Sequence, residues 1–94
     1  MSRKPVEQTE HKTTVAQALR IAIMAELEAI NLYEELAEQI EDEGIRKVFL
    51  DIAREEKTHV GEFLQLLLQV DSEQVEELEK GKREVRELLE KERQ

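Results

Sequence analysis

The amino-acid sequence predicts an all-α protein: an antiparallel helical hairpin followed by a third, shorter helix, with two chains pairing into a four-helix bundle. The 94 residues include only three glycines and one proline, a composition typical of long helices. Apolar residues recur at helical spacing along two stretches of about 26–30 residues. A chain of this size buries only a modest core by itself, so we expect it to bury its apolar faces by self-association.

The N-terminal segment differs from the rest of the chain. Residues 1–12 contain the single proline and show no apolar periodicity, so we expect a flexible tail ahead of one helical domain at 13–94. His11 lies in this tail, where an ordinary exposed histidine is expected.

Capping signals divide the hairpin into its two helices. The first helix is predicted over 13–43, with Thr13 or Thr14 as its N-cap. Gly44 is expected to end it, and the three acidic residues directly before Gly44 suit the N-terminus of the following helix. The second helix is predicted over 45–70, because its apolar residues keep a helical period to that point.

A third helix is predicted over 72–91. Asp71 is a plausible N-cap with Gln74 three residues further on. Gly81 interrupts this helix at a cost of about 1 kcal/mol relative to alanine. Most of its other positions alternate Glu with Lys and Arg, which indicates a solvated face.

Charge and composition exclude several classes of function. The net charge is −9 and aromatic residues make up 3% of the chain, which disfavours nucleic-acid binding and contact with anionic membranes. Without cysteine, the chain offers neither a disulfide nor a thiolate metal site. No signal sequence and no apolar run near 18 residues is visible, so we expect a cytoplasmic protein with no membrane partner.

Two carboxylates and an imidazole interrupt the apolar stripes of the hairpin. At 100° per residue, Glu26 lies on the centre line of the first stripe and Glu56 on that of the second. His59 lies within about 60° of Glu56. Counted from a turn near residues 43–44, antiparallel packing places Glu26 within roughly 3 Å of the level of His59 and 8 Å of that of Glu56. The three side chains should therefore converge at mid-hairpin.

Such a cluster needs a neutralising partner. Burying an unpaired carboxylate costs several kcal/mol, and the basic residues of the hairpin lie off these centre lines. Iron, manganese or zinc accepts oxygen and nitrogen ligands of this kind. The alternative is a hydrogen-bonded polar pair of Glu56 and His59, with Glu26 as partner of a buried polar group.

The three residues make half of a known type of site. Di-iron carboxylate bundles use a Glu from each of two helices and a Glu-x-x-His pair from each of the other two. This chain offers Glu26 once and the Glu56–His59 pair once. Two protomers related by a two-fold axis would supply the full set.

Two further residues are candidates for a role at this site. Tyr33 lies seven residues after Glu26 on the same face, where it either fills core space or hydrogen-bonds a ligating carboxylate or a bound oxygen species. Glu28 lies about 160° from the stripe and by position alone is a surface acid.

The combination of Glu26 with Tyr33, followed by Arg-Glu-Glu-Lys-Thr-His at 54–59, resembles the ferritin-like superfamily of ferritins and rubrerythrins. A short chain with one hairpin and a third helix is most similar to the encapsulated ferritins. The resemblance implies that dimers form a ferroxidase centre at their interface and associate into a ring. It also implies residence inside an encapsulin shell, where Fe(II) is oxidised and the product is stored as mineral.

The resemblance assigns roles to single residues. Glu26, Glu56 and His59 match the iron ligands, and Tyr33 matches the neighbouring tyrosine. Glu28 matches one acid of the family's iron-uptake site. No apolar targeting peptide is visible at 90–94, so the resemblance implies fusion to the shell protein or another route of delivery.

Three functions stay open at this point. The first is a ferroxidase that feeds iron storage, with iron supplying the redox chemistry. The second is a non-catalytic helical oligomerisation or cargo module with structural metal sites. A rubrerythrin-like peroxidase ranks lower, because the chain has no cysteine for an electron-donating iron site. A plain coiled coil is disfavoured because the stripes follow a 3.6-residue period.

Overall fold

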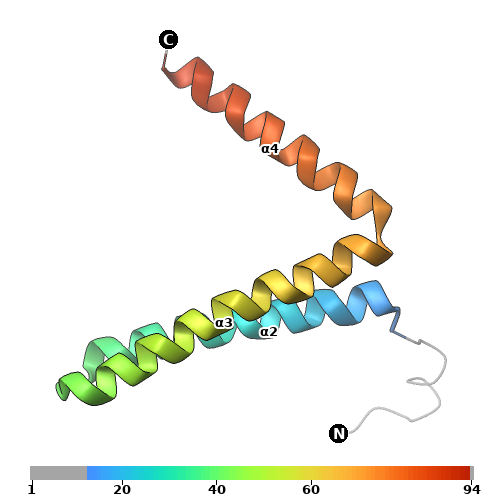
Figure 1. Ribbon diagram of the computed structural model, residues 1–94. Helices are drawn as coiled ribbons and strands as arrows, with labels where there is room; N and C mark the ends of the chain where they lie inside the picture. Colours follow the sequence, from blue (N-terminus) through green and yellow to red (C-terminus); the bar gives the residue numbers. More distant parts are fainter. Residues whose placement is uncertain (1–12, 94) are drawn as a thin grey trace, which may run out of the picture.

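The computed structural model describes residues 13–93, which form three helices and no strand. They are α2 (Val15–Gln39), α3 (Glu43–Val70) and α4 (Ser72–Glu92). Helices α2 and α3 run antiparallel as a hairpin, and α4 leaves the hairpin at the end where α2 begins (Figure 1). The predicted all-α fold, a hairpin followed by a shorter helix, is confirmed. The predicted tail at 1–12, with His11, lies outside the described residues.

Helix α2 begins with a complete capping box. Thr14 Oγ1 accepts a hydrogen bond from the backbone N–H of Gln17, and the Gln17 side chain accepts one from the backbone N–H of Thr14, both at 3.0 Å. Two of the backbone donors that a helix N-terminus leaves free are thus satisfied. Of the two predicted N-caps, Thr14 is the one used.

The turn of the hairpin lies at residues 40–42, earlier than the expected turn near 43–44. The first helix ends at Gln39 rather than 43, and the second begins at Glu43 rather than 45, so Gly44 lies inside α3 instead of ending α2. The reason is a strong N-cap: the Asp42 carboxylate accepts a hydrogen bond from the Ile45 N–H at 3.0 Å. No described glycine has a positive φ, so Gly44 does not act as a left-handed C-cap.

The hairpin has a thin core. Among the described residues, the buried apolar side chains are Ile30, Ala37, Ala53 and Leu67. The two alanines let the helices approach closely, and the Tyr33 ring meets the Phe49 ring edge to face at 6.1 Å. Fifteen large apolar side chains of the described residues remain exposed, five on each of the three helices, so the three helices leave much of their apolar surface open to solvent.

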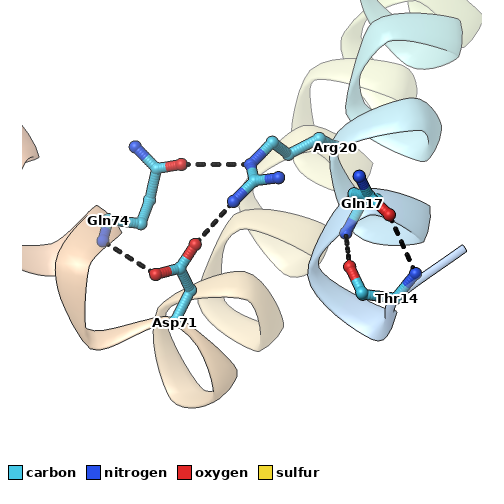
Figure 2. A network of polar contacts seen from close by, with 5 residues as sticks. All are labelled: Thr14, Gln17, Arg20, Asp71 and Gln74. Atoms are coloured by element: carbon cyan, nitrogen blue, oxygen red, sulfur yellow. Dashed lines mark hydrogen bonds and ion pairs between the residues drawn. The ribbon is translucent and has the colours of Figure 1, made fainter.

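A polar network fixes the junction between α3 and α4 (Figure 2). Asp71 is the only residue between the two helices, and its carboxylate accepts a hydrogen bond from the Gln74 N–H at 3.1 Å. The same carboxylate pairs with the Arg20 guanidinium of α2, whose Nε donates to the Gln74 side chain at 3.3 Å. Asp71 therefore caps α4, as predicted, and also ties its first turn to α2. We call Arg20, Asp71 and Gln74 the junction clamp.

Crossing a bilayer requires a helix that is both long and apolar. Within residues 13–93, no helix combines the length and the apolar character that a membrane crossing needs.

Candidate metal centre

Three potential metal ligands meet across the middle of the hairpin. His59 Nδ1 lies 2.6 Å from a carboxylate oxygen of Glu56 and 3.1 Å from one of Glu26. One ligand atom from each of the three residues lies within 4.8 Å of the others. The structure thus brings together the residues that the sequence placed at one level.

The local structure explains this convergence. Glu56 and His59 are three residues apart on α3, so their side chains lie on the same face and hydrogen-bond to each other. Glu26 reaches them from α2 because the antiparallel packing of the hairpin sets the two helices at matching levels. An ion pair between Lys57 of α3 and Glu34 of α2 also joins the two helices, with 3.1 Å between the amine and a carboxylate oxygen. Lys57 directly follows Glu56 in the sequence.

The cluster lies at the edge of the packed face, not deep inside it. The carboxylates are mostly covered, with 18% of the Glu26 and 17% of the Glu56 side chain exposed, whereas His59 is 45% exposed. The expected burial of these groups is therefore found for the two carboxylates but not for His59, because one hairpin leaves the side next to His59 open.

The electrostatics of the cluster favour a positive charge on the imidazole. The hydrogen bond with the Glu56 carboxylate is the largest cause that raises the pKa of His59 above its ordinary value of 6.5, although partial desolvation opposes it. The negative charges of Glu26, Glu56 and Glu62 raise this pKa further. When protonated, the imidazole can act as counter-ion to the two carboxylates. A metal cation would take over that role and displace the proton.

The donor set fits a transition metal. Two carboxylate oxygens and one imidazole nitrogen are the ligands that iron, manganese and zinc accept, whereas magnesium and calcium prefer oxygen alone. Three ligands leave the coordination sphere incomplete, and the open side next to His59 is where a further set could enter. Glu26, Glu56 and His59 are thus the residues that could hold a metal.

Tyr33 and Glu28 lie outside the cluster of three. The Tyr33 ring packs against Phe49, and its hydroxyl makes no hydrogen bond to another described side chain. Glu28 is exposed on α2, two residues from Glu26. The assignments of Tyr33 to the neighbourhood of the metal and of Glu28 to an iron-uptake site stay predictions.

Some contributors were not singled out from the sequence. Glu62 lies one turn after His59 and adds its charge to the cluster, which the spacing of three residues on a helix could have indicated. The Glu34–Lys57 ion pair follows from opposite charges on facing flanks of the hairpin. At exposed positions such as these, an ion pair contributes little to stability.

Comparisons with known proteins place the chain in a family. The profile of the rubrerythrin family matches residues 17–93. A ferritin-like–encapsulin shell fusion protein of Pyrococcus furiosus is 60% identical over 77 residues, which cover 82% of this chain and 22% of that protein. An encapsulin nanocompartment cargo protein of Myxococcus xanthus is 34% identical over 62 residues, or 66% of this chain and 48% of that protein.

A solved structure has the same fold. The crystal structure of the encapsulated ferritin domain from Pyrococcus furiosus matches with a TM-score of 0.78 and 52% sequence identity, covering 94% of both chains. The chain thus spans a solved domain almost completely, but only about a fifth and about half of the two longer relatives.

Proposed function

This chain belongs to the rubrerythrin family of ferritin-like proteins, and from that premise we propose that it is one half of a ferroxidase. Two copies pair so that Glu26, Glu56 and His59 of each hold a di-iron centre, which oxidises Fe(II) to Fe(III). The observation that carries this proposal is the meeting of two carboxylates and an imidazole from α2 and α3 within 4.8 Å.

The exposure of the site supports the need for two copies. The hairpin covers the carboxylates on one side and leaves His59 45% exposed. A second hairpin laid over this side by a two-fold axis brings an identical set of three ligands. The same contact covers apolar residues of α3 that one chain leaves exposed, among them Ile45, Leu66 and Val70. A second copy of the hairpin would thus both complete the set of metal ligands and bury the exposed apolar residues of α3.

The side chains have separate tasks in the proposed reaction. Bound iron supplies the one-electron chemistry, with dioxygen or peroxide as the oxidant. The carboxylates of Glu26 and Glu56 hold the cation and favour the higher charge of Fe(III) over Fe(II). His59 must lose its proton to become a ligand, so its proton leaves when the metal binds. Tyr33 is proposed to line the site with its hydroxyl, while its ring packs on Phe49.

We place this activity inside a shell. The relatives named for an encapsulin fusion and an encapsulin cargo protein support a location within an encapsulin nanocompartment of the cytoplasm, where oxidised iron is stored. Association of the paired hairpins into a ring belongs to the same proposal. Glu28 is assigned to iron uptake at the outer face of α2, where it is exposed.

Rapid mixing of the protein with Fe(II) in air tests the proposal. Stopped-flow absorbance is expected to show fast oxidation by the wild type and a loss of at least tenfold in Glu56→Ala and His59→Ala. Glu55→Ala is the matched control, because Glu55 is an exposed neighbour on α3 outside the cluster. Oxidation by Glu56→Ala as fast as by the wild type would contradict the assignment. A Tyr33→Phe variant that oxidises iron at the wild-type rate would remove Tyr33 from it.

A second candidate function is a non-catalytic oligomerisation or cargo module. It is favoured by the way Glu26, Glu56 and His59 already satisfy one another without metal, and the described residues contain no buried side-chain polar atom without a partner. Metal analysis after Fe(II) loading separates the two. About one iron per chain is the ferroxidase expectation, and none favours the module. A peroxidase would instead show reduction of peroxide with an added electron donor.

A further inference from the structure

Helix α4 takes no part in the site and is left largely uncovered. It leaves the hairpin at the junction and extends away from it (Figure 1). Its distal apolar side chains are the most exposed, with Val85 at 56% and Leu88 at 63%. An amphipathic helix is stabilised in water mainly by packing its apolar face, so α4 needs a cover.

The hairpin of the same chain cannot provide that cover. An antiparallel return onto α3 requires a connection of about 2–5 residues, but Asp71 alone separates α3 from α4. The junction clamp further ties the first turn of α4 to Arg20. The hairpin therefore leaves the apolar side of α4 open to a partner.

The exposed stripe of α4 has the spacing of a coiled-coil seam. Its members alternate steps of three and four residues, which is the spacing of positions a and d: Val75, Leu78, Lys82, Val85, Leu89 and Glu92. The Lys82 amine reaches the Glu79 carboxylate at 3.1 Å, so its aliphatic stem is free to lie along the seam. The stripe is narrow on the helix surface, so one other helix is enough to cover it.

The residues beside the seam are complementary to those of a second α4 in the antiparallel direction. A two-fold axis between positions 83 and 84 sets Leu78 at the level of the partner's Leu89. On one flank, Glu79 then lies within about 3 Å of the level of the partner's Arg86, and the pair occurs twice. A parallel pair would lack this match, because it sets Arg86 beside Gly81 instead.

The opposite flank explains a glycine that the chain by itself does not require. Gly81 lies inside α4, where glycine is unfavourable, and a Cβ added there would meet no described atom within 4 Å. In the antiparallel pair, Gly81 faces the partner's Leu88 at nearly the same level. Leu88 is the most exposed large apolar side chain of α4. The missing side chain thus leaves room for the most exposed apolar side chain of the partner's α4.

We propose that α4 binds α4 of a second copy of this chain as an antiparallel two-fold pair. This contact is separate from the pairing of the hairpins, and it involves none of the metal-binding residues. It also does not depend on iron chemistry, so it stands or falls independently of the ferroxidase proposal.

Charge exchange tests the pairing in solution. In the metal-free full chain, Glu79→Arg and Arg86→Glu each place like charges opposite one another, and native mass spectrometry is expected to show a loss of the larger assemblies to two chains or fewer. Mixing the two variants restores opposite charges across the pair and should recover the larger assemblies. Glu87→Arg, on the far side of α4, is the matched control and should behave as the wild type.

Introduced cysteines test the direction of the pair, since the chain has none of its own. A mixture of Leu78→Cys and Leu89→Cys should form a disulfide between unlike variants on oxidation. Each variant alone should not, because like positions are then about 16 Å apart along the axis, beyond the reach of a disulfide. Cross-linking of each variant with itself would show a parallel pair and overturn the proposal. The proposal would also be overturned if neither charge variant changed the assemblies, or if mixing the two variants did not recover them. Either result would indicate that α4 packs on the hairpin of another chain instead.

Discussion

His59 is the residue on which the charge of the site depends. In the metal-free chain its pKa is raised above 6.5, first by the hydrogen bond with Glu56 and then by the nearby carboxylates. A pKa that is higher in the folded than in the unfolded chain adds stability that is fully present below pH 6.5 and is lost as the pH rises through the folded value. Metal binding has the opposite dependence, because it needs the neutral imidazole.

This balance gives a prediction for the pH dependence of the metal-free protein. NMR titration of His59 should show a pKa above 6.5, and Glu56→Gln should lower it toward 6.5, because the amide removes both the charge and the charged acceptor. The midpoint of thermal unfolding of the metal-free wild type should fall as the pH rises through the His59 pKa. Glu55→Gln serves as control and should leave the titration unchanged. A His59 pKa that is the same in Glu56→Gln and wild type would show that the Glu56 carboxylate does not cause the rise.

At the residue scale, the sequence predicted the meeting of Glu26, Glu56 and His59 from helical periodicity and counting alone. It did not predict the exposure of His59, because a stripe on one helix does not say how many other helices cover it. The Tyr33–Phe49 contact could not be predicted for a related reason. Periodicity shows on which face of a helix a ring lies, but not which side chain of the other helix it contacts.

At the element scale, the helix ends follow capping chemistry more closely than they follow glycine. Asp42 accepts the Ile45 N–H and begins α3, and Asp71 does the same for α4 with Gln74. Asp71 could be identified in advance because a Gln follows three residues later. The position of the hairpin turn could not be identified in advance. The three acidic residues at 41–43 are all possible N-caps or first-turn residues of α3, and Gly44 is a possible end of α2.

The N-cap at the turn gives a prediction for stability. Asp42→Ala leaves the Ile45 N–H without its acceptor, and the free energy of unfolding should fall by about 1 kcal/mol. Glu41→Ala, one residue earlier and exposed, should change it by less than about 0.5 kcal/mol. Urea unfolding followed by circular dichroism at one fixed protein concentration measures both. Equal values for the two variants would show that Asp42 is not the effective cap.

At the scale of the whole molecule, the described residues leave fifteen large apolar side chains exposed and bury only four apolar residues. Composition and length predicted self-association, which stays a prediction. The junction clamp could not be predicted, because Arg20 and Asp71 are 51 positions apart and their contact depends on the direction in which α4 leaves the hairpin. The charged residues of α4 form a solvated face as predicted, and the structure adds that its apolar residues are exposed as well.

A site divided between two copies links iron to assembly. Because both hairpins would contribute ligands, Fe(II) binding should shift single chains toward pairs. Sedimentation velocity of Glu79→Arg, in which α4 pairing is expected to be lost, should show iron-dependent pairing under anaerobic conditions. The same variant with His59→Ala added should show a much weaker shift. Pairing that is complete without iron and indifferent to it would mean that apolar contacts alone suffice.

The one-residue junction at Asp71 has a geometric consequence. If the hairpins pair about one two-fold axis and the α4 helices about another, as proposed, the angle at which α4 leaves the hairpin sets the angle between the two contacts of each chain. The junction clamp, in which Arg20 is the residue from α2, ties that angle to the hairpin. A constant angle would turn each successive chain by the same amount, so the proposed ring would close at a fixed number of chains, and Arg20 would help to set that number.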